Sequence, residues 1–235
     1  MMATHAPTNT YGSKRDSLAA YFDGTAQKAW IDLTSDAKVS GIRKTVRAGR
    51  TEMRETLLGW LPQDLRRKRV LDAGCGTGAL SIDAACRGGH VIAVDIAAGL
   101  VEIGRDRAPA FLGHGRVDWK VGDMLDPAHG EFDHVVAMDS LIHYTAGDIV
   151  ETLGELAKRT HGSILFTFAP YTRMLGAMHS VGKLFPRGNR SPAIVPVSED
   201  RLRDRLRDLR GWRIGRTQRV SSGFYTSQAM ELVRR

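Results

Sequence analysis

The stretch VLDAGCGTGALSIDAACRGGHVIAVDI, residues 70–96, decides the fold. An apolar run leads into a glycine cluster, which is followed by a helical stretch and a second apolar run ending in Asp95. Glycines at 74, 76 and 78 can take positive φ and carry no side chain, so the backbone can approach a ligand closely. This pattern is typical of the nucleotide-binding half of a doubly wound sheet, where ligands bind beyond the strand ends.

The alternation continues outward from this unit. Runs that read as strands recur between helical stretches: RVLDAG, HVIAVDI, VDWKVGDM, FDHVVAMDSL and SILFTFAP. Five such runs predict a parallel sheet with helices on both faces. Two last runs, WRIGRTQRVS and FYTSQAMELV, flank Ser-Gly and predict a closing hairpin. We therefore expect an α/β, Rossmann-like fold with a seven-stranded, mostly parallel sheet and one antiparallel strand.

The rest of the chain divides by pattern. Residues 1–13 lack periodicity and are expected to form a disordered tail, and residues 14–62 a helical arm. In that arm Ile42, Val46, Met53, Leu57 and Leu61 make an apolar stripe, with arginines largely elsewhere. Residues 63–235 form the main domain, in which 171–197 is too long for an ordinary connection and is expected to be a lid.

The glycine loop alone fits two cofactors. Gly74-x-Gly76-x-x-Ala79 also satisfies the loose dinucleotide fingerprint, with Asp95 at about the expected distance. Two further acids favour S-adenosylmethionine instead: Asp72 can meet an amino-acid ammonium group, and Asp123 in GDM an adenine amino group. Asp95 would then accept from the ribose hydroxyls. The arrangement resembles the class I S-adenosylmethionine-dependent methyltransferase fold, and a dehydrogenase is the alternative.

The motifs that the sequence lacks exclude several classes of methyl acceptor. The chain has no Asn/Asp-Pro-Pro-aromatic motif of nucleic-acid N-methylases, and its two cysteines lie in the cofactor half. No second acidic pair with the look of a metal site follows the fourth strand, which argues against a catechol-type site. AMDSLIHY, residues 137–144, follows that strand instead and places Asp139, His143 and Tyr144 beside the expected methyl donor.

Several motifs together resemble the magnesium-protoporphyrin IX O-methyltransferase family. They are YFDGTAQKAW (21–30), DAGCGTG, AMDSLIHY, FTFAP, GKLFPRGNRSP (182–192) and SSGFYTSQAMELVRR. The resemblance implies methyl transfer from S-adenosylmethionine to one propionate of magnesium protoporphyrin IX, giving the monomethyl ester and S-adenosylhomocysteine. Another small-molecule O-methyltransferase of the same fold is the alternative. Magnesium would arrive inside the substrate, so we expect no metal site of the protein's own. It also implies that a histidine and a tyrosine of the arm region act in catalysis. By motif these are His143, which we expect to be neutral, and Tyr21, with Tyr11 and Tyr144 as the alternatives to Tyr21.

The remaining site predictions follow from that implied chemistry. The expected cofactor-binding residues are Asp72, Gly74, Cys75, Gly76, Gly78, Asp95, Ile96, Asp123, Met124 and Asp139. The flat macrocycle needs an apolar slot and its second propionate a cation, for which the lid offers candidates. With Tyr144, the expected substrate-binding residues are Met174, Met178, Lys183, Phe185, Arg187 and Arg190, with Arg173, Leu175 and Leu184 beside them.

Net charge and hydropathy limit which partners and which location in the cell are expected. The net charge is +8, and eight arginines against two aspartates lie between Arg201 and Arg219. This segment is either a solvated face or a contact for an acidic partner: anionic lipid, the porphyrin-binding subunit of magnesium chelatase, or nucleic acid. Nucleic acid is disfavoured because aromatic residues other than Trp212 do not interleave with the arginines. No run approaches the roughly 18 apolar residues of a membrane span, so we expect a cytoplasmic protein, with peripheral membrane contact as an option.

Overall fold

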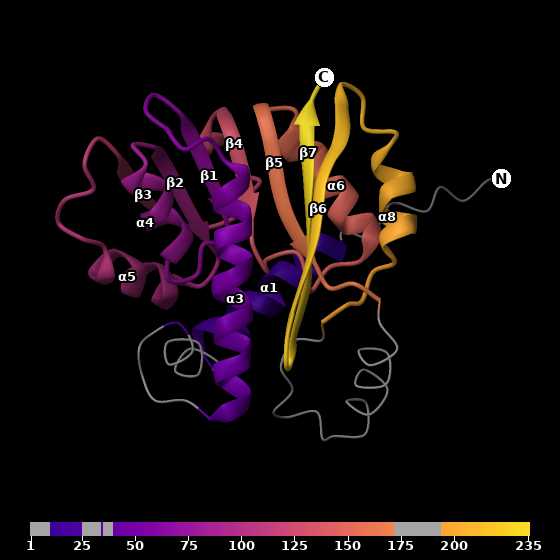
Figure 1. Ribbon diagram of the computed structural model, residues 1–235, viewed down its shortest axis with the longest axis horizontal. Helices are drawn as coiled ribbons and strands as arrows, with labels where there is room; N and C mark the ends of the chain where they lie inside the picture. Colours follow the sequence, from indigo (N-terminus) through magenta and orange to yellow (C-terminus); the bar gives the residue numbers. More distant parts are fainter. Residues whose placement is uncertain (1–9, 25–33, 35–39, 172–193) are drawn as a thin grey trace.

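The glycine-rich stretch forms a strand, loop, helix and strand within a seven-stranded sheet (Figure 1). The computed structural model describes residues 10–24, 34, 40–171 and 194–235. Its helices are α1 (Thr10–Asp23), α3 (Gly41–Trp60), α4 (Ala79–Cys86), α5 (Ala98–Arg107), α6 (Ala146–Ala157) and α8 (Glu199–Leu206), with the short 3₁₀ helix η1 (Pro127–His129). Its strands are β1 (Arg69–Ala73), β2 (His90–Asp95), β3 (Arg116–Val121), β4 (Phe132–Ala137), β5 (Thr160–Phe168), β6 (Trp212–Ser222) and β7 (Tyr225–Arg234).

The sheet has the strand order β3-β2-β1-β4-β5-β7-β6. Strands β1 to β5 pair in parallel, and β7 runs antiparallel to both β5 and β6. The order reverses at β1, which lies between β2 and β4, so the loops after these strands open at one edge of the sheet. The expected α/β class I methyltransferase fold, with one antiparallel strand, is confirmed.

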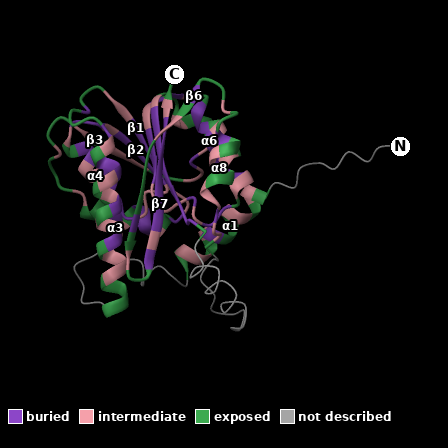
Figure 2. Ribbon diagram, turned by 45° about the vertical axis from the view of Figure 1, so that its right-hand side comes forward, coloured by how far each residue is buried: buried purple, intermediate pink, exposed green. Residues whose placement is uncertain are grey.

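Both faces of the sheet are buried, and alternate residues of a strand enter different cores. Val70 packs with α3 and α4, whereas Leu71 packs with α1, α6 and α8. The helices contribute leucines at helical spacing to these cores, for example Leu153 and Leu156 of α6. Figure 2 shows the central strands as the buried part of the molecule and the outward helix faces as exposed. Successive side chains of these strands therefore pack into helical layers on opposite faces of the sheet.

The first turn of helix α3 is more exposed than the rest of the helix, which corrects one part of the expected apolar stripe. Ser40 caps its first turn by accepting a hydrogen bond from the backbone of Arg43. Met53 and Leu57 are fully buried as expected, but Ile42 is 54% exposed. The first turn of α3 extends past the tip of the β6–β7 hairpin (Figure 1).

The N-terminal boundary is also corrected. The first helix begins at Thr10 rather than at residue 14, so residues 10–13 are not part of a disordered tail; residues 1–9 lie outside the described residues. Long-range contacts fix this turn, because the Thr10 hydroxyl donates to Asp148 and the Tyr11 hydroxyl to Asp123. The sequence of the turn carries no periodic signal of its own, and the tertiary contacts determine its structure.

Candidate active site

A cavity of about 580 Å³ lies at the carboxyl ends of β1, β2 and β4 and is covered by α1 and α3. Its size falls within the range of about 300–1,000 Å³ that is usual for small-molecule sites. The structure brings these predicted residues together around it: Asp72, Gly74, Cys75, Gly76, Asp95, Ile96, Met124, Asp139, His143, Tyr144 and Tyr21. The lid candidates between residues 172 and 193 lie outside the described residues.

The glycine loop is held by hydrogen bonds to the neighbouring strand. The backbone N–H groups of Gly74 and Cys75 both donate to the carbonyl of Val94, and the N–H of Gly76 donates to Asp95. Gly74 has φ 84° and lies so close to Ser140 that a Cβ there would overlap the serine side chain. The loop therefore needs glycine both for its backbone conformation and for its close packing.

Gly78 does not line the cavity. It has φ 74° and begins α4, and a Cβ there would overlap the ring of Trp119 on β3. Its contribution to the described structure is to let this ring pack against the start of the helix.

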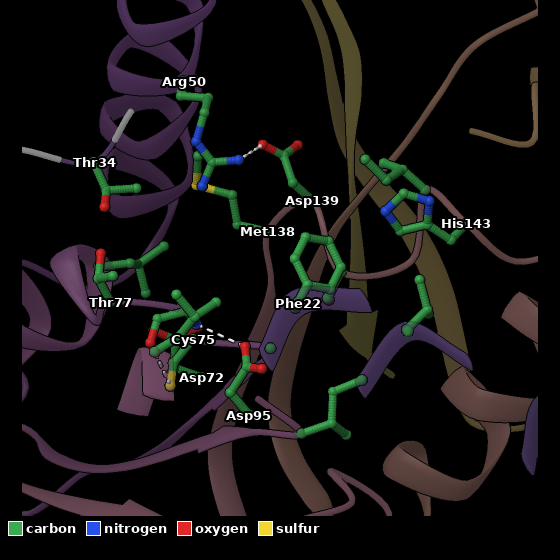
Figure 3. A pocket seen from close by; sticks show the side chains of 18 of the residues that line it. Phe22, Thr34, Arg50, Asp72, Cys75, Thr77, Asp95, Met138, Asp139 and His143 are labelled. Atoms are coloured by element: carbon green, nitrogen blue, oxygen red, sulfur yellow. Dashed lines mark hydrogen bonds and ion pairs between the residues drawn. The ribbon is translucent and has the colours of Figure 1, made fainter. Parts of the chain in front are cut away.

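Two acids flank the glycine loop: Asp72, which is buried in β1, and Asp95, which is half-buried at the end of β2 (Figure 3). Asp72 is 2% exposed and accepts a 2.5 Å hydrogen bond from the hydroxyl of Ser81 on α4. Burial raises the pKa of Asp72 to about 7, and the nearby charge of Asp95 adds to the rise. Cys75 lies beside them, and burial likewise raises the pKa of its thiol.

Asp95 shapes the loop as well as facing the cavity. One carboxylate oxygen accepts from the N–H of Gly76 at 2.8 Å and the other from the N–H of Ala97 at 2.9 Å. These bonds tie the end of β2 to the glycine loop, while burial still raises the pKa of Asp95. A carboxylate held in this way has lone pairs left for ribose hydroxyls, because each oxygen can accept more than one hydrogen bond.

Asp123 is placed differently from what the sequence suggested. It is not among the residues lining the cavity, whereas its neighbours Gly122 and Met124 are. Its carboxylate accepts from the Tyr11 hydroxyl at 2.6 Å and from Arg15 at 2.8 Å, both on α1. Burial alone would raise the pKa of Asp123, but these bonds and the N–H of Leu125 lower it overall. In the described structure Asp123 anchors the helix that covers the site.

Asp139 is part of a buried polar network. Its side chain is 4% exposed and forms a 2.6 Å ion pair with Arg50 on α3 (Figure 3). It also accepts hydrogen bonds from Thr167 on β5 and from Tyr225 and Ser227 on β7. Next to Asp139, burial raises the pKa of the Tyr225 hydroxyl. The backbone at Asp139 is left-handed, with φ 55°, a conformation that aspartate tolerates better than most residues.

His143 and the aromatic residues of α1 form the other wall. His143 is 8% exposed, and its ring centroid lies 6.1 Å from that of Phe22 (Figure 3). Tyr21 precedes Phe22, lines the same cavity, and its hydroxyl makes no hydrogen bond to the described residues. Tyr11 and Tyr144 instead stack on each other at 5.2 Å, with Tyr11 bound to Asp123, and burial raises the pKa of both hydroxyls.

Sequence reasoning missed much of the lining, including Phe22, Arg50 and Ser140. Arg50 belongs to a row with Arg43, Arg47 and Arg54, whose spacing of three and four residues places them on one helix face. That spacing was a usable signal. The Ser140 hydroxyl is buried and has no hydrogen-bond partner within the described ranges.

This chain is similar to known methyltransferases in sequence. Two family models match: magnesium-protoporphyrin IX methyltransferase C-terminus over residues 137–234, and a methyltransferase domain over residues 70–161. The magnesium-protoporphyrin O-methyltransferase of Rhodobacter capsulatus is 50% identical over 222 residues, which are 94% of this chain and 97% of the relative. The chain belongs to the magnesium-protoporphyrin O-methyltransferase family. The same enzyme of Synechocystis is 30% identical, covering 97% of this methyltransferase and 99% of the relative.

Solved structures agree with the family. The crystal structure of magnesium protoporphyrin IX methyltransferase from Synechocystis with bound S-adenosylhomocysteine has a TM-score of 0.82 at 30% identity, covering 94% of this chain and 99% of that one. The structure with bound S-adenosylmethionine has a TM-score of 0.80 at 26% identity, covering 99% and 100%. The predicted family, enzyme class and cofactor are confirmed.

Two further features concern metals and membranes. Among the residues described, no group of three or more His, Cys, Asp or Glu side chains could hold a metal ion. Within the same ranges, no helix has both the length and the apolar character that crossing a bilayer requires.

Proposed function

We propose that this chain transfers the methyl group of S-adenosylmethionine to a propionate carboxylate of magnesium protoporphyrin IX, in (bacterio)chlorophyll biosynthesis. The 50% identity to the Rhodobacter capsulatus enzyme, over almost the full length of both chains, carries this conclusion. The cavity supports it independently, because it combines a glycine cradle, the acids Asp72 and Asp95, and the buried Ser140 hydroxyl, which has no hydrogen-bond partner among the described residues. These groups fit a cofactor with an amino-acid end and a ribose.

The chain's own residues have a modest chemical task. The bound cofactor supplies an electrophilic methyl group. A propionate has a pKa near that of glutamate, roughly 4.3, so its oxygen is already anionic at neutral pH and needs no general base. The C–O bond forms as the C–S bond breaks, and the electron pair of that bond remains on sulfur. The rate then depends mainly on how well the carboxylate is positioned. In model systems, ideal alignment lowers the activation barrier by on the order of 7–11 kcal/mol.

We assign the positioning of the carboxylate to His143 and Tyr21. Both line the cavity, and they approach it from different elements: His143 from the loop after β4 and Tyr21 from α1. A neutral imidazole can orient a carboxylate by one hydrogen bond without quenching its charge. Tyr21 is preferred over Tyr11 and Tyr144, because those two side chains stack on each other and Tyr11 is bound to Asp123.

Replacing His143 tests this assignment. His143→Asn is expected to lower kcat about fivefold, the effect of losing one neutral hydrogen bond of about 1 kcal/mol, while cofactor affinity stays unchanged. If His143 acts as the neutral imidazole, the wild-type rate falls from pH 8 to pH 6 and the variant rate does not. Steady-state kinetics across this range provide the comparison, and identical pH profiles for the two proteins would contradict the assignment.

The function itself is tested directly with purified protein. Incubation with S-adenosylmethionine and magnesium protoporphyrin IX is expected to give a product heavier by one methyl group in mass spectrometry. Metal-free protoporphyrin is the control, and its failure to react would make the porphyrin metal a recognition element. If no ester forms although the cofactor is bound, magnesium protoporphyrin IX is not the methyl acceptor. Only the assignment as a methyltransferase would then remain.

We also propose that the C-terminal basic segment contacts an acidic partner, either anionic membrane or the porphyrin-binding subunit of magnesium chelatase. Four of its arginines are engaged by acidic side chains: Arg203, Arg207, Arg216 and Arg219. The other four form no ion pair with the described residues: Arg201, Arg205, Arg210 and Arg213. They leave a positive surface along α8, the start of β6 and the turn between them. Salt-sensitive flotation with vesicles containing anionic lipid would favour the membrane, and a lack of binding to both partners would refute the proposal.

A further inference from the structure

One face of α3 forms a wall of the cavity and carries a row of arginines. Arg43, Val46, Arg47, Arg50, Thr51 and Arg54 all line it, at the spacing of a single helix face. The adjacent Lys44 points elsewhere and is not among the lining residues. The row runs from the covered part of the cavity at Arg50 and Arg54 to the first turn of the helix at Arg43.

Most of the lining arginines already have partners. Arg15 pairs with Asp123, Arg50 with Asp139 and Arg54 with Asp83. The Arg43 side chain is exposed and makes no hydrogen bond or ion pair to any residue in the described ranges. At the first turn of α3 the cavity therefore carries a guanidinium group that no described acidic side chain neutralises.

Apolar side chains line the same cavity as Arg43. Val46 lies on the same face of α3, and Ile194, from the segment before α8, lines the cavity and is 41% exposed. The tip of the β6–β7 hairpin packs against a different face of α3, since the N–H of Phe224 contacts the Thr45 hydroxyl at 3.5 Å. Figure 1 shows this tip beside the lower part of α3. The cavity lining thus combines apolar side chains with a guanidinium group that has no acidic partner within the described ranges.

The proposed substrate has two propionates on one flat apolar ring system. One propionate must reach the methyl group inside, and a cavity of about 580 Å³ is the size of a site for a single small molecule. With the cofactor in that cavity, the second propionate is placed toward the exposed end of the lining, where Arg43 lies. Resting on the proposed function, we propose that Arg43 binds this second, unreacting propionate and so restricts the enzyme to one methylation.

The restriction follows from charge. A guanidinium group binds a carboxylate through paired, charge-assisted hydrogen bonds, and it cannot bind a methyl ester in the same way. To be methylated again, the monoester product would have to turn around and present its neutral ester to Arg43. That orientation leaves the cation without its anionic partner, so the product binds more weakly than the diacid.

Arg43→Gln, with Lys44→Gln as the matched control, tests the proposal. Loss of a hydrogen bond to a charged group predicts a rise of about tenfold in KM for magnesium protoporphyrin IX in Arg43→Gln, with the dissociation constant for S-adenosylmethionine unchanged. Arg43→Lys is expected to recover part of this effect. Lys44→Gln removes the same charge one residue away, outside the lining, and should match the wild type.

Two substrate readouts separate binding of the second propionate from a general loss of charge. With a magnesium porphyrin whose second propionate is an amide, wild type and Arg43→Gln should have equal KM values. In long incubations Arg43→Gln should form a larger share of diester than wild type does. Equal KM values for the diacid, or an equal loss in Lys44→Gln, would overturn the proposal, as would weaker cofactor binding in Arg43→Gln. If the wild type forms no ester at all, the proposed function fails instead.

Discussion

Asp139→Ala is expected to lower the free energy of unfolding by about 3–5 kcal/mol, the usual cost of removing one partner from a buried ion pair. The side chain is 4% exposed and that of Arg50 is 21% exposed, so the arginine left behind would be only partly solvated. The change also removes the acceptor for Tyr225 and Ser227, which join the loop after β4 to strand β7. Denaturant unfolding monitored by circular dichroism measures the difference.

Three controls make this result specific to the buried network. Asp204→Ala removes an exposed partner of Arg207, and it should change stability by less than about 1 kcal/mol. Asp139→Asn keeps a side chain that tolerates φ 55° and should recover part of the loss. Replacing Arg50 and Asp139 together by apolar residues should cost less than Asp139→Ala alone, because no charge is left unpaired. A loss below about 1 kcal/mol in Asp139→Ala would show that the network contributes little.

The fold was predictable because its signals are local. Strands β1, β2 and β4 are short, largely apolar runs, and Gly74 and Gly76 mark the loop that follows β1. The hairpin turn was found in the same way, since Gly223 lies between two alternating runs and has φ 56°. These features depend on near neighbours in sequence, which a single chain displays directly.

The site was predictable only where strand ends define it. Asp95 was found because it terminates β2, but the partners of Asp123 and Asp139 were not. Arg15 is 108 residues from Asp123 and Arg50 is 89 residues from Asp139, and both arginines read in sequence as solvated helix charges. Only the packing of α1 and α3 over the strand ends brings these pairs together. Contacts of this kind require the tertiary structure.

The affinity for S-adenosylmethionine is expected to rise about tenfold or more between pH 5.5 and pH 7. Burial raises the pKa of Asp72 to about 7, so the carboxyl is mostly protonated at pH 5.5 in the free protein. If Asp72 meets the ammonium group of the cofactor, only its ionised form binds well, and binding releases a proton. The range stops at pH 7 because an α-amino group itself loses its proton near pH 7.7–8.0.

The raised pKa of Asp72 also makes the stability of the cofactor-free protein depend on pH. The unfolded chain releases the Asp72 proton near pH 3.9, whereas the folded chain holds it until pH is about 7, so protonation favours folding between these values. The stability that Asp72 contributes is therefore lost as pH rises from about 4 to 7. Asp72→Asn, which keeps a hydrogen-bond acceptor for Ser81, removes this loss.

Calorimetric titration of wild type and Asp72→Asn at several pH values distinguishes the possible sources of the effect. The variant should bind more weakly at pH 7 and show little change between pH 5.5 and pH 7. Proton release, measured in buffers of different ionisation enthalpy, should fall to near zero in the variant. Parallel slopes would place the titrating group elsewhere, with Asp95 the next candidate because burial raises its pKa too. A variant that binds as tightly as wild type at pH 7 would remove Asp72 from the cofactor site, because an amide cannot replace a carboxylate opposite an ammonium group.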